Sequence, residues 1–394
     1  MLGQLPERAP DKILHIMRLF AEDTRPGKID LGVGVFRDAA GRTPVMAAVK
    51  TAEARLLERQ QTKGYVALAG DPEFHAAMRG LVLGAAVAAD RVAALATPGG
   101  TGAVRQCFEA ARLANPDVRV LLPEPSWPNH ASILDTMGIA WASYRYYDAA
   151  TGGLDRAGML EDLARTGAGD LVLLHGCCHN PTGADPQPAD WAEIAMVLGQ
   201  TGAVPMVDMA YQGFGDGLEA DAAGPRLLAE TLPEMLLAVS GSKNFGLYRE
   251  RVGMALAVCA TPAEATRAQA LLAWLNRQAY AFPPDHGARL VTDILTDPDL
   301  RTSWTTELSA MRELMNGNRR ALAQALQAES GSDRFGFIAG QRGMFSLIGA
   351  DSAQVAAMRD EDALYMIGDG RINLAGLTPE TIPRAARIIA RHLR

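Results

Sequence analysis

Six short runs of apolar residues recur between positions 118 and 259, and segments with helical periodicity lie between them. The runs are mostly continuous rather than alternating, which is typical of strands that are buried on both faces. Strands of this kind with helices between them predict an α/β fold whose mostly parallel sheet is flanked by helices. The runs cover residues 118–122, 141–147, 171–175, 204–208, 235–240 and 253–259.

Both ends of the chain add helices to this pattern. Asp11 is a plausible cap for a helix that begins just after it, and residues 382–393 form a closing helix. Between Trp304 and Leu326 an apolar stripe with helical spacing predicts a long helix that leads out of the large domain. We therefore expect a small α/β domain built from both termini. Residues 1–40 form the N-terminal part of this small domain, and residues 41–300 form the large domain. Residues 301–394 form the connecting helix and the C-terminal part of the small domain.

Composition narrows the class of protein. The chain has 394 residues, is 48% hydrophobic and carries a net charge of -7, which fits a globular protein with a sizeable core and argues against nucleic acid as a partner. Its first residues carry charges and prolines where a signal peptide has an apolar run, and no stretch resembles a membrane span. The four cysteines are too few for a disulfide framework. We expect a cytoplasmic protein.

Lysine is unusually scarce. The chain has five lysines against 33 arginines, and Lys243 is the only lysine after Lys63. Arginine keeps its proton near neutral pH, whereas a lysine amine can lose its proton and then act as a base or nucleophile. Lys243 is therefore the first candidate for a catalytic residue.

Polar residues stand where predicted strands end. His175, Asp208 and Ser240 each close a strand, and the carboxyl ends of parallel strands form the ligand-binding edge of such sheets. The stretch 97–102, TPGGTG, opens a helix and could hold an anion at the helix N-terminus, although an ordinary turn is the alternative. The run 175–179, HGCCH, lacks the spacing of a metal site, and we expect no metal.

Together these segments resemble the aspartate and aromatic amino acid aminotransferases, a subfamily of the fold type I pyridoxal-phosphate enzymes, and are most similar to the bacterial aromatic branch. The resemblance covers nearly the whole chain and is strongest in SGSKNFGLYRERVG and HGCCHNPTG. It also includes LGVGV, GYVALAGDPEF, TPGGTGAVR, PSWPNH, VDMAYQGFGDG, NRQAYAFPPDHGA and GRINLAGL.

The resemblance implies a role for each residue that binds the cofactor pyridoxal 5'-phosphate in the large domain. Lys243 would form the covalent bond to the cofactor and move the substrate proton, Asp208 would keep the pyridine nitrogen protonated, and Tyr211 would bind the ring's 3' oxygen. His130 and His175 would support Asp208. The full set of implied cofactor-binding residues is Gly100, Thr101, Trp127, Asn180, Asp208, Tyr211, Ser240, Ser242, Lys243, Arg251 and, from the neighbouring subunit, Tyr65.

The same resemblance implies the substrate-binding residues and a homodimer with shared sites. Arg371 would clamp the α-carboxylate, and Arg277 would reach across the dimer to the side-chain carboxylate of aspartate or glutamate. The other implied substrate-binding residues are Gly34, Trp127, Asn180 and Phe345.

Departures from the subfamily pattern concern specificity. Phe282 replaces a polar residue of the usual SNPP sequence, position 36 is phenylalanine, and position 241 is glycine. Residue 369 is aspartate where the subfamily commonly has serine before the carboxylate arginine. We expect transfer of an amino group from aromatic amino acids, and from aspartate or glutamate, to a 2-oxo acid such as 2-oxoglutarate. A dedicated aspartate aminotransferase is the alternative. An elimination or decarboxylation enzyme and a cofactor-binding regulator are less consistent with the two arginines and the short N-terminal region.

Overall fold

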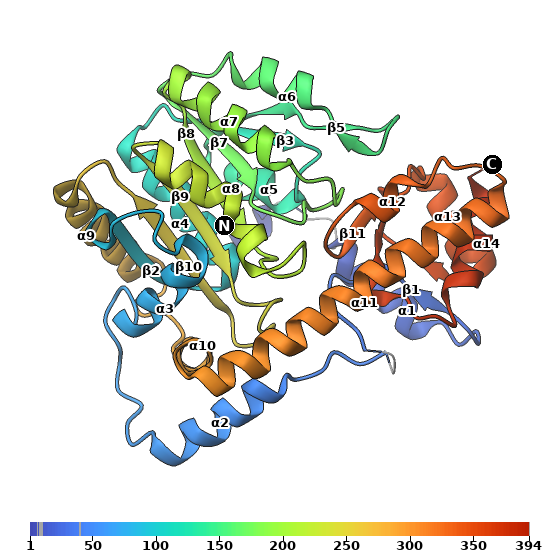
Figure 1. Ribbon diagram of the computed structural model, residues 1–394, viewed down its shortest axis with the longest axis horizontal. Coiled ribbons are helices and arrows are strands. Elements are labelled where there is room, and N and C mark those ends of the chain that lie inside the picture. Colours follow the sequence, from blue (N-terminus) through green and yellow to red (C-terminus); the bar gives the residue numbers. More distant parts are fainter. Residues whose placement is uncertain (6, 8–10, 39–40, 394) are drawn as a thin grey trace.

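The computed structural model describes residues 1–5, 7, 11–38 and 41–393. Its centre is a seven-stranded sheet in the order β2-β10-β9-β8-β7-β3-β4, in which β10 is antiparallel to both neighbours and the other pairs are parallel (Figure 1). The predicted α/β class with a mostly parallel sheet is confirmed. The strands are β2 (Val92–Pro98), β3 (Arg119–Glu124), β4 (Ala140–Arg145), β7 (Asp170–His175), β8 (Val204–Met209), β9 (Met235–Ser240) and β10 (Val252–Val258).

Two layers of helices bury the sheet. One face packs on α4, α5 and α9, and the other on α3, α6, α7 and α8. Their bounds are α3 (Pro72–Leu83), α4 (Gly99–Ala114), α5 (Pro128–Met137), α6 (Arg156–Leu163), α7 (Pro188–Thr201), α8 (Leu218–Thr231) and α9 (Pro262–Ala279). Because both faces are covered, the central strands are apolar throughout, and this explains why their sequences do not alternate.

The run 141–147 differs from its prediction as one strand. β4 ends at Arg145, and a separate hairpin follows, made of β5 (Tyr147–Asp148) and β6 (Gly153–Leu154). Arg145 binds Asp162 and Glu161 of α6 through its guanidinium, so the polar end of the run turns toward solvent and α6 rather than continuing the sheet.

Helix α11 (Pro298–Ser330) contains the long helix expected between Trp304 and Leu326. It begins at Asp297, whose carboxylate accepts hydrogen bonds from the N–H groups of Asp299 and Leu300 at 2.9 and 3.0 Å. Its first half buries Trp304 against the sheet core, and its second half buries Leu326 in a second core. In Figure 1 it runs from the sheet body to the group of elements around the C-terminus.

The second core joins the two ends of the chain. Ile29 and Leu31 pack in it with residues from Leu322 to Leu393. Strand β1 pairs with β12 in parallel, and β11 pairs with β13 antiparallel. The elements of this region are α1 (Lys12–Glu22), β1 (Ile29–Asp30), α12 (Phe337–Gly340), β11 (Phe345–Leu347), α13 (Ser352–Asp362), β12 (Leu364–Tyr365), β13 (Arg371–Asn373) and α14 (Ile382–His392). Residues 40 and 394, which end two of the predicted parts, lie outside the described residues.

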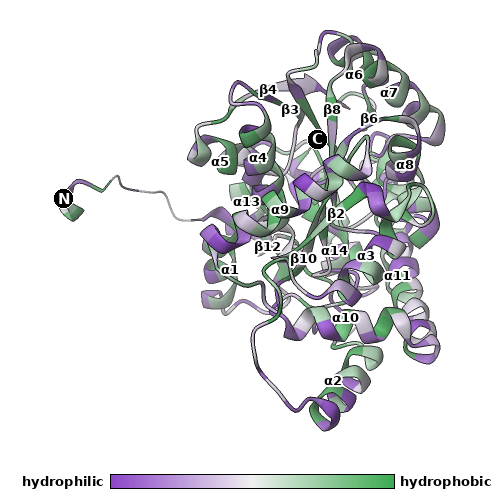
Figure 2. Cartoon of the chain, turned by 90° about the vertical axis from the view of Figure 1, so that its left-hand side faces the viewer, coloured by the Kyte–Doolittle hydropathy of each residue, from purple (hydrophilic) through white to green (hydrophobic). Residues whose placement is uncertain are grey.

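Helices α2 (Ala47–Arg59) and α10 (His286–Thr296) lie beside α11 at one end of the molecule. After α2 the chain runs without regular structure over residues 60–67, a segment that we call the arm, and it loops along the outside of the body (Figure 2). Short 3-10 turns lie at Leu2–Gln4, Ala89–Arg91 and Leu374–Gly376. Within the described residues, no helix has both the length and the apolar character needed to cross a bilayer.

Candidate active site

A cavity of about 250 Å³ lies at the carboxyl ends of β7, β8 and β9, where the N-terminus of α4 and the pair β11–β13 also meet. Most of the residues singled out in the sequence line this cavity, although they come from distant parts of the chain. They are Gly34, Gly100, Thr101, Trp127, His175, Asn180, Asp208, Tyr211, Ser240, Ser242, Lys243, Arg251, Phe345 and Arg371. Tyr65 and Arg277 do not line it.

The turn after β9 carries Lys243 into the cavity. The Ser242 N–H donates to Ser240 Oγ at 3.2 Å, and the Gly246 N–H donates to the Lys243 carbonyl at 3.0 Å. Trp304 of α11 holds the far side of this turn, since its Nε1–H donates to the Asn244 carbonyl at 2.7 Å and its ring stacks on Phe245 at 4.5 Å. The backbone around the lysine is therefore held from both sides.

The surroundings of Lys243 favour its uncharged amine. Burial lowers its pKa, the nearby Asp208 carboxylate partly opposes this, and the Arg251 guanidinium lowers the pKa further. Its Nζ atom lies 4.8 Å from the centre of the Tyr211 ring. The four other lysines differ from Lys243: Lys12, Lys50 and Lys63 are exposed, and Lys28 binds backbone carbonyls away from the cavity. An amine with a lowered pKa can act as nucleophile or base, as expected for Lys243.

A chain of hydrogen bonds runs from Asp208 into the protein, and we call it the histidine relay. Asp208 Oδ2 lies 3.0 Å from His130 Nε2, and Ser126 Oγ lies 2.9 Å from His130 Nδ1 and 3.3 Å from His175 Nε2. At the far end the Asn180 N–H donates to His175 Nδ1 at 3.4 Å. Asn180 also accepts a bond from Arg371 at 3.1 Å, so the relay extends toward the other end of the cavity.

The backbone N–H of Asn180, which donates to His175, determines which nitrogen of each histidine in the relay carries a proton. Burial and the nearby His130 lower the pKa of His175 to about 3, so its ring is neutral. Because its Nδ1 accepts from a backbone N–H, its proton is on Nε2 and points to Ser126 Oγ. Ser126 must then donate to His130 Nδ1, which leaves the His130 proton on Nε2, directed at Asp208.

Asp208 stays ionised as a result. Burial alone would raise its pKa, but the hydrogen bond that His130 donates opposes that effect, and the pKa of Asp208 lies below its usual value. A buried carboxylate with one oxygen bonded to His130 can hold a protonated nitrogen with the other. This is the role that the sequence resemblance implied for Asp208.

An anion can bind where α4 begins. Gly100 and Thr101 are in the first turn of this 16-residue helix, whose free N–H groups favour negative charge. Arg251 lies opposite and donates to Ser242 Oγ at 3.2 Å. A Cβ atom on Gly100 would lie 2.8 Å from the Cβ of Ser240, so only glycine leaves the space between them.

Arg371 is buried next to Phe345 and offers a second place where an anion could bind. Its guanidinium donates to Asn180 Oδ1 at 3.1 Å and to the Gly32 carbonyl at 3.3 Å, and it lies 4.2 Å from the centre of the Phe345 ring. Its Nε atom is buried without a hydrogen-bond partner among the described residues. Burial lowers the pKa of Arg371, and a bound carboxylate would offset that cost.

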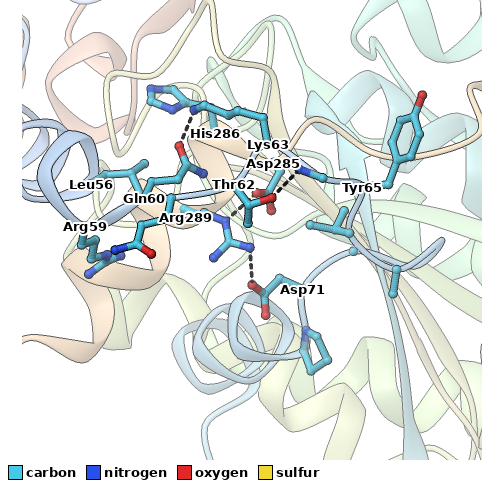
Figure 3. A pocket seen from close by; sticks show the side chains of 16 residues that line it. Leu56, Arg59, Gln60, Thr62, Lys63, Tyr65, Asp71, Asp285, His286 and Arg289 are labelled. Carbon is cyan, nitrogen blue, oxygen red and sulfur yellow. Dashed lines mark hydrogen bonds and ion pairs between the residues drawn. The ribbon is translucent and has the colours of Figure 1, made fainter.

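Tyr65 and Arg277 meet on another surface. The Tyr65 ring stacks on Phe282 with centres 4.5 Å apart and planes at 14°, and the Arg277 guanidinium lies 5.9 Å from the same ring. Tyr65 is 87% exposed. Figure 3 shows it on the arm, where it lines a pocket together with Asp71, Asp285 and other residues.

Sequence reasoning missed several residues of the site. Ile13, Val33, Val35 and Tyr248 also line the cavity, and all but Ile13 lie inside motifs that were recognised. Ser126 was missed because the motif PSWPNH was read for its tryptophan and histidine, while serine commonly begins a turn. The relay distances reveal its role.

Comparisons with known proteins agree with this geometry. The chain matches the family described as aminotransferase class I and II over residues 26–389. It is 56% identical to the aromatic-amino-acid aminotransferase of Paracoccus denitrificans, covering 99% of both chains. It is 46% identical to the tyrosine aminotransferase of Rhizobium meliloti, covering 96% of each, and 42% identical to the aspartate aminotransferase of Escherichia coli, covering 99% and 100%.

Solved structures give the same result. An aromatic amino acid aminotransferase with 3-indolebutyric acid superposes with a TM-score of 0.97 at 56% identity, covering 100% of both chains. An aromatic-amino-acid aminotransferase from Burkholderia pseudomallei, covalently bound to pyridoxal phosphate, superposes with a TM-score of 0.96 at 39% identity, again covering 100% of both. The family expected from the motifs is confirmed, and this chain belongs to the class I and II aminotransferases.

Proposed function

We propose that this protein is an aromatic amino acid aminotransferase that uses pyridoxal 5'-phosphate. The observation that carries the proposal is the full-length identity of 56% to an aromatic-amino-acid aminotransferase, against 42% to an aspartate aminotransferase. The apolar lining at the Arg371 end of the cavity, with Phe345, Val33 and Val35, suits an aromatic side chain. The alternative is a dedicated aspartate aminotransferase.

The cavity fits the cofactor. Pyridoxal phosphate, when bound, supplies an aldehyde that accepts an amine and a ring that takes up electrons. The anion site at α4 and Arg251 would hold its phosphate, Asp208 its ring nitrogen, and Lys243 its aldehyde carbon. Trp127 would lie on the ring face, and Tyr211 and Asn180 would bind the 3' oxygen. The unpartnered Nε of Arg371 leaves a donor for the substrate carboxylate.

The chain's own residues then perform two tasks. Arg371 and Asn180 bind and orient the α-carboxylate, so that the Cα–H bond faces the lysine side of the cavity. Lys243 Nζ would take the proton from the substrate Cα and hand it to the carbon that had been the cofactor's aldehyde carbon, which is the proton movement that transamination requires. The histidine relay keeps Asp208 negative throughout, because each of its protons is committed to the next acceptor.

The proposed active form is a homodimer with shared sites. Tyr65 and Arg277 lie away from their own cavity on an exposed surface, which supports the idea that they complete the site of a second copy. Tyr65 would reach the phosphate, and Arg277 would meet the second carboxylate of aspartate, glutamate or a 2-oxo diacid.

The division into two domains and the cytoplasmic location also stay predictions. The separate second core supports a small domain built from both termini, and limited proteolysis that released one stable fragment would support the boundary near residue 300. Cell fractionation tests the location.

Absorbance and kinetics test the activity. The purified protein loaded with pyridoxal phosphate should lose its visible band on adding phenylalanine and regain it with 2-oxoglutarate. A steady-state comparison should then give phenylalanine a kcat/KM at least equal to that of aspartate. No spectral change with any amino acid would contradict the aminotransferase activity, and a strong preference for aspartate would favour the alternative.

A further inference from the structure

Residues 32–36 form an irregular segment that runs along the cavity, and we call it the strap. Val33, Gly34 and Val35 line the cavity directly. The strap follows β1 and has no strand partner of its own within the described residues. Its position must therefore come from other contacts.

Side chains supply most of those contacts. Asn373 Nδ2 donates to the Val33 carbonyl at 2.6 Å and to the Val35 carbonyl at 2.9 Å. At the end of the strap, the Phe36 N–H donates to the Tyr248 hydroxyl at 3.2 Å. Asn373 thus holds two of the strap's carbonyls with one amide group.

Asn373 is itself held firmly. It is 1% exposed, and its Oδ1 accepts from the Ala375 N–H at 3.0 Å. It lies on β13 two residues after Arg371, and it is the register partner of Phe345 on β11. Asn373, which holds the strap, therefore belongs to the same small sheet as Arg371 and Phe345.

The strap packs closely on that sheet. A Cβ atom on Gly34 would lie 2.9 Å from Cζ of Phe345, closer than carbon atoms normally approach. A small displacement of the strap would therefore change the space between Val33, Val35 and Phe345, where a substrate side chain has to fit.

We propose that Asn373 is a positioning residue for substrate selection, because it fixes the strap that forms the apolar wall of the substrate cavity. The inference rests on the proposed function, in which an aromatic side chain is placed against this wall. Loss of the two donated hydrogen bonds would loosen the wall. The binding of each substrate would then weaken in proportion to the apolar area that it buries there.

Two variants of Asn373 and one matched control test this idea. Asn373→Ala removes both donated bonds, and Asn373→Asp removes them while keeping the acceptor for Ala375. Asn318 is the control: it is also buried, at 4% exposure, and its Nδ2 also donates to two carbonyls, those of Leu374 and Leu377, at 3.0 and 2.9 Å. Asn318→Ala should therefore cost similar stability without touching the strap.

In the holoenzyme, both Asn373 variants should raise KM for phenylalanine about ten-fold while kcat changes less than three-fold. KM for aspartate should rise less than three-fold, so the preference for phenylalanine falls. Asn318→Ala should leave that preference within two-fold of wild type. Equal losses for the two substrates in Asn373→Ala, or the same loss of preference in Asn318→Ala, would overturn the proposal.

Hydrogen exchange gives a readout that does not depend on the substrate. Amides of residues 31–36 should exchange at least ten times faster in Asn373→Ala than in wild type or Asn318→Ala, and unchanged exchange would also overturn the proposal. If Asn373→Ala does not fold, Tyr248→Phe removes the acceptor for Phe36 and should release the other end of the strap. A wild-type enzyme inactive with phenylalanine would refute the proposed substrate class, while the exchange result would still decide the role of Asn373.

Discussion

Ser126 is the residue on which the protons of the histidine relay depend, since it accepts from one histidine and donates to the other. We expect Ser126→Ala to slow proton abstraction from the substrate Cα about ten- to a hundred-fold, because a buried donor or acceptor left unpaired costs about 1–3 kcal/mol. The step can be followed by stopped-flow absorbance with a deuterated substrate. Ser126→Thr keeps the hydroxyl and should retain most of the rate; an equally slow threonine variant would assign the effect to packing.

His175 should make the protein sensitive to acid. Burial and the nearby His130 lower its pKa to about 3 in the folded state, whereas a histidine in the unfolded chain titrates near 6.5. As the pH falls from 6.5 toward 3, His175 takes up a proton in the unfolded chain but stays neutral in the folded protein. His175 therefore lowers the free energy of unfolding by about 1.4 kcal/mol for each pH unit between 6.5 and about 3.

Urea unfolding at pH 5 and 7.5 measures this effect. The difference between the two values should be smaller in His175→Asn than in wild type, and unchanged in a variant of His15, which is exposed on α1. Asp185 acts in the opposite direction, since burial raises its pKa to about 6, but it is present in all three proteins and cancels. The same pH dependence in His175→Asn would show that His175 is not the group responsible.

At the scale of the element, we expect the close packing at the start of α4 to affect how tightly the cofactor binds. The Cβ added by Gly100→Ala would meet Ser240 at 2.8 Å and push it into the anion site. We expect the dissociation constant for pyridoxal phosphate, measured by fluorescence titration of the apoenzyme, to rise at least ten-fold.

Gly317 provides the control for that substitution. It lies within α11, and an added Cβ would meet nothing within 4 Å. Gly317→Ala should leave cofactor binding unchanged and stabilise the protein by about 0.5–1 kcal/mol, because alanine loses less backbone freedom in a helix. Weakened cofactor binding in both variants would show that the effect does not arise at the anion site.

The elements themselves show what a single sequence can and cannot predict. The run 235–240 coincides with β9 because it is apolar throughout and ends at polar residues. The run 253–259 was recognised as a strand, but its apolar pattern reports burial on both faces and says nothing of direction, so the antiparallel setting of β10 was not foreseen. Strand β2 was missed because its sequence, VAALATP, is rich in alanine, which favours neither strand nor turn strongly.

The site was more predictable than the sheet. Motif residues such as Lys243 and Arg371 must be of one type for chemical reasons, so their identity is legible in the sequence. The roles that we propose for Ser126 and Asn373 depend on geometry: each residue type is common in turns or strand ends, and only the distances to their partners distinguish them. The histidine relay and the strap therefore required coordinates.

At the scale of the whole molecule, we expect Arg277 of one subunit to affect how the second copy uses acidic substrates. Arg277→Leu should lower kcat/KM for aspartate about ten- to a hundred-fold, because a desolvated charge-assisted hydrogen bond contributes about 1.5–3 kcal/mol. Phenylalanine should be affected little, since it has no second carboxylate. Steady-state assays with both amino acids check this, and equal losses for the two would refute the specificity argument.

Subunit mixing tests whether the arginine crosses the interface. Dimers that combine a Lys243→Ala subunit with an Arg277→Leu subunit would have both changes in one site and neither in the other, so aspartate activity should return. If each site used its own arginine, both sites would stay impaired. No recovery in verified mixed dimers would contradict the shared site.

The distribution of lysines has a practical consequence. Three exposed lysines, Lys12, Lys50 and Lys63, lie within the first 63 residues, whereas Lys243 faces the cavity. Amine-reactive coupling to a bead or sensor surface would therefore use these lysines and leave Lys243 intact when the cofactor occupies it. Lys63 differs from the other two, because it lies on the arm two residues before Tyr65. Coupling at Lys63 would tether the surface that a second copy has to approach. Replacing Lys63 with arginine would direct the coupling to Lys12 and Lys50 and leave the surface around Tyr65 free.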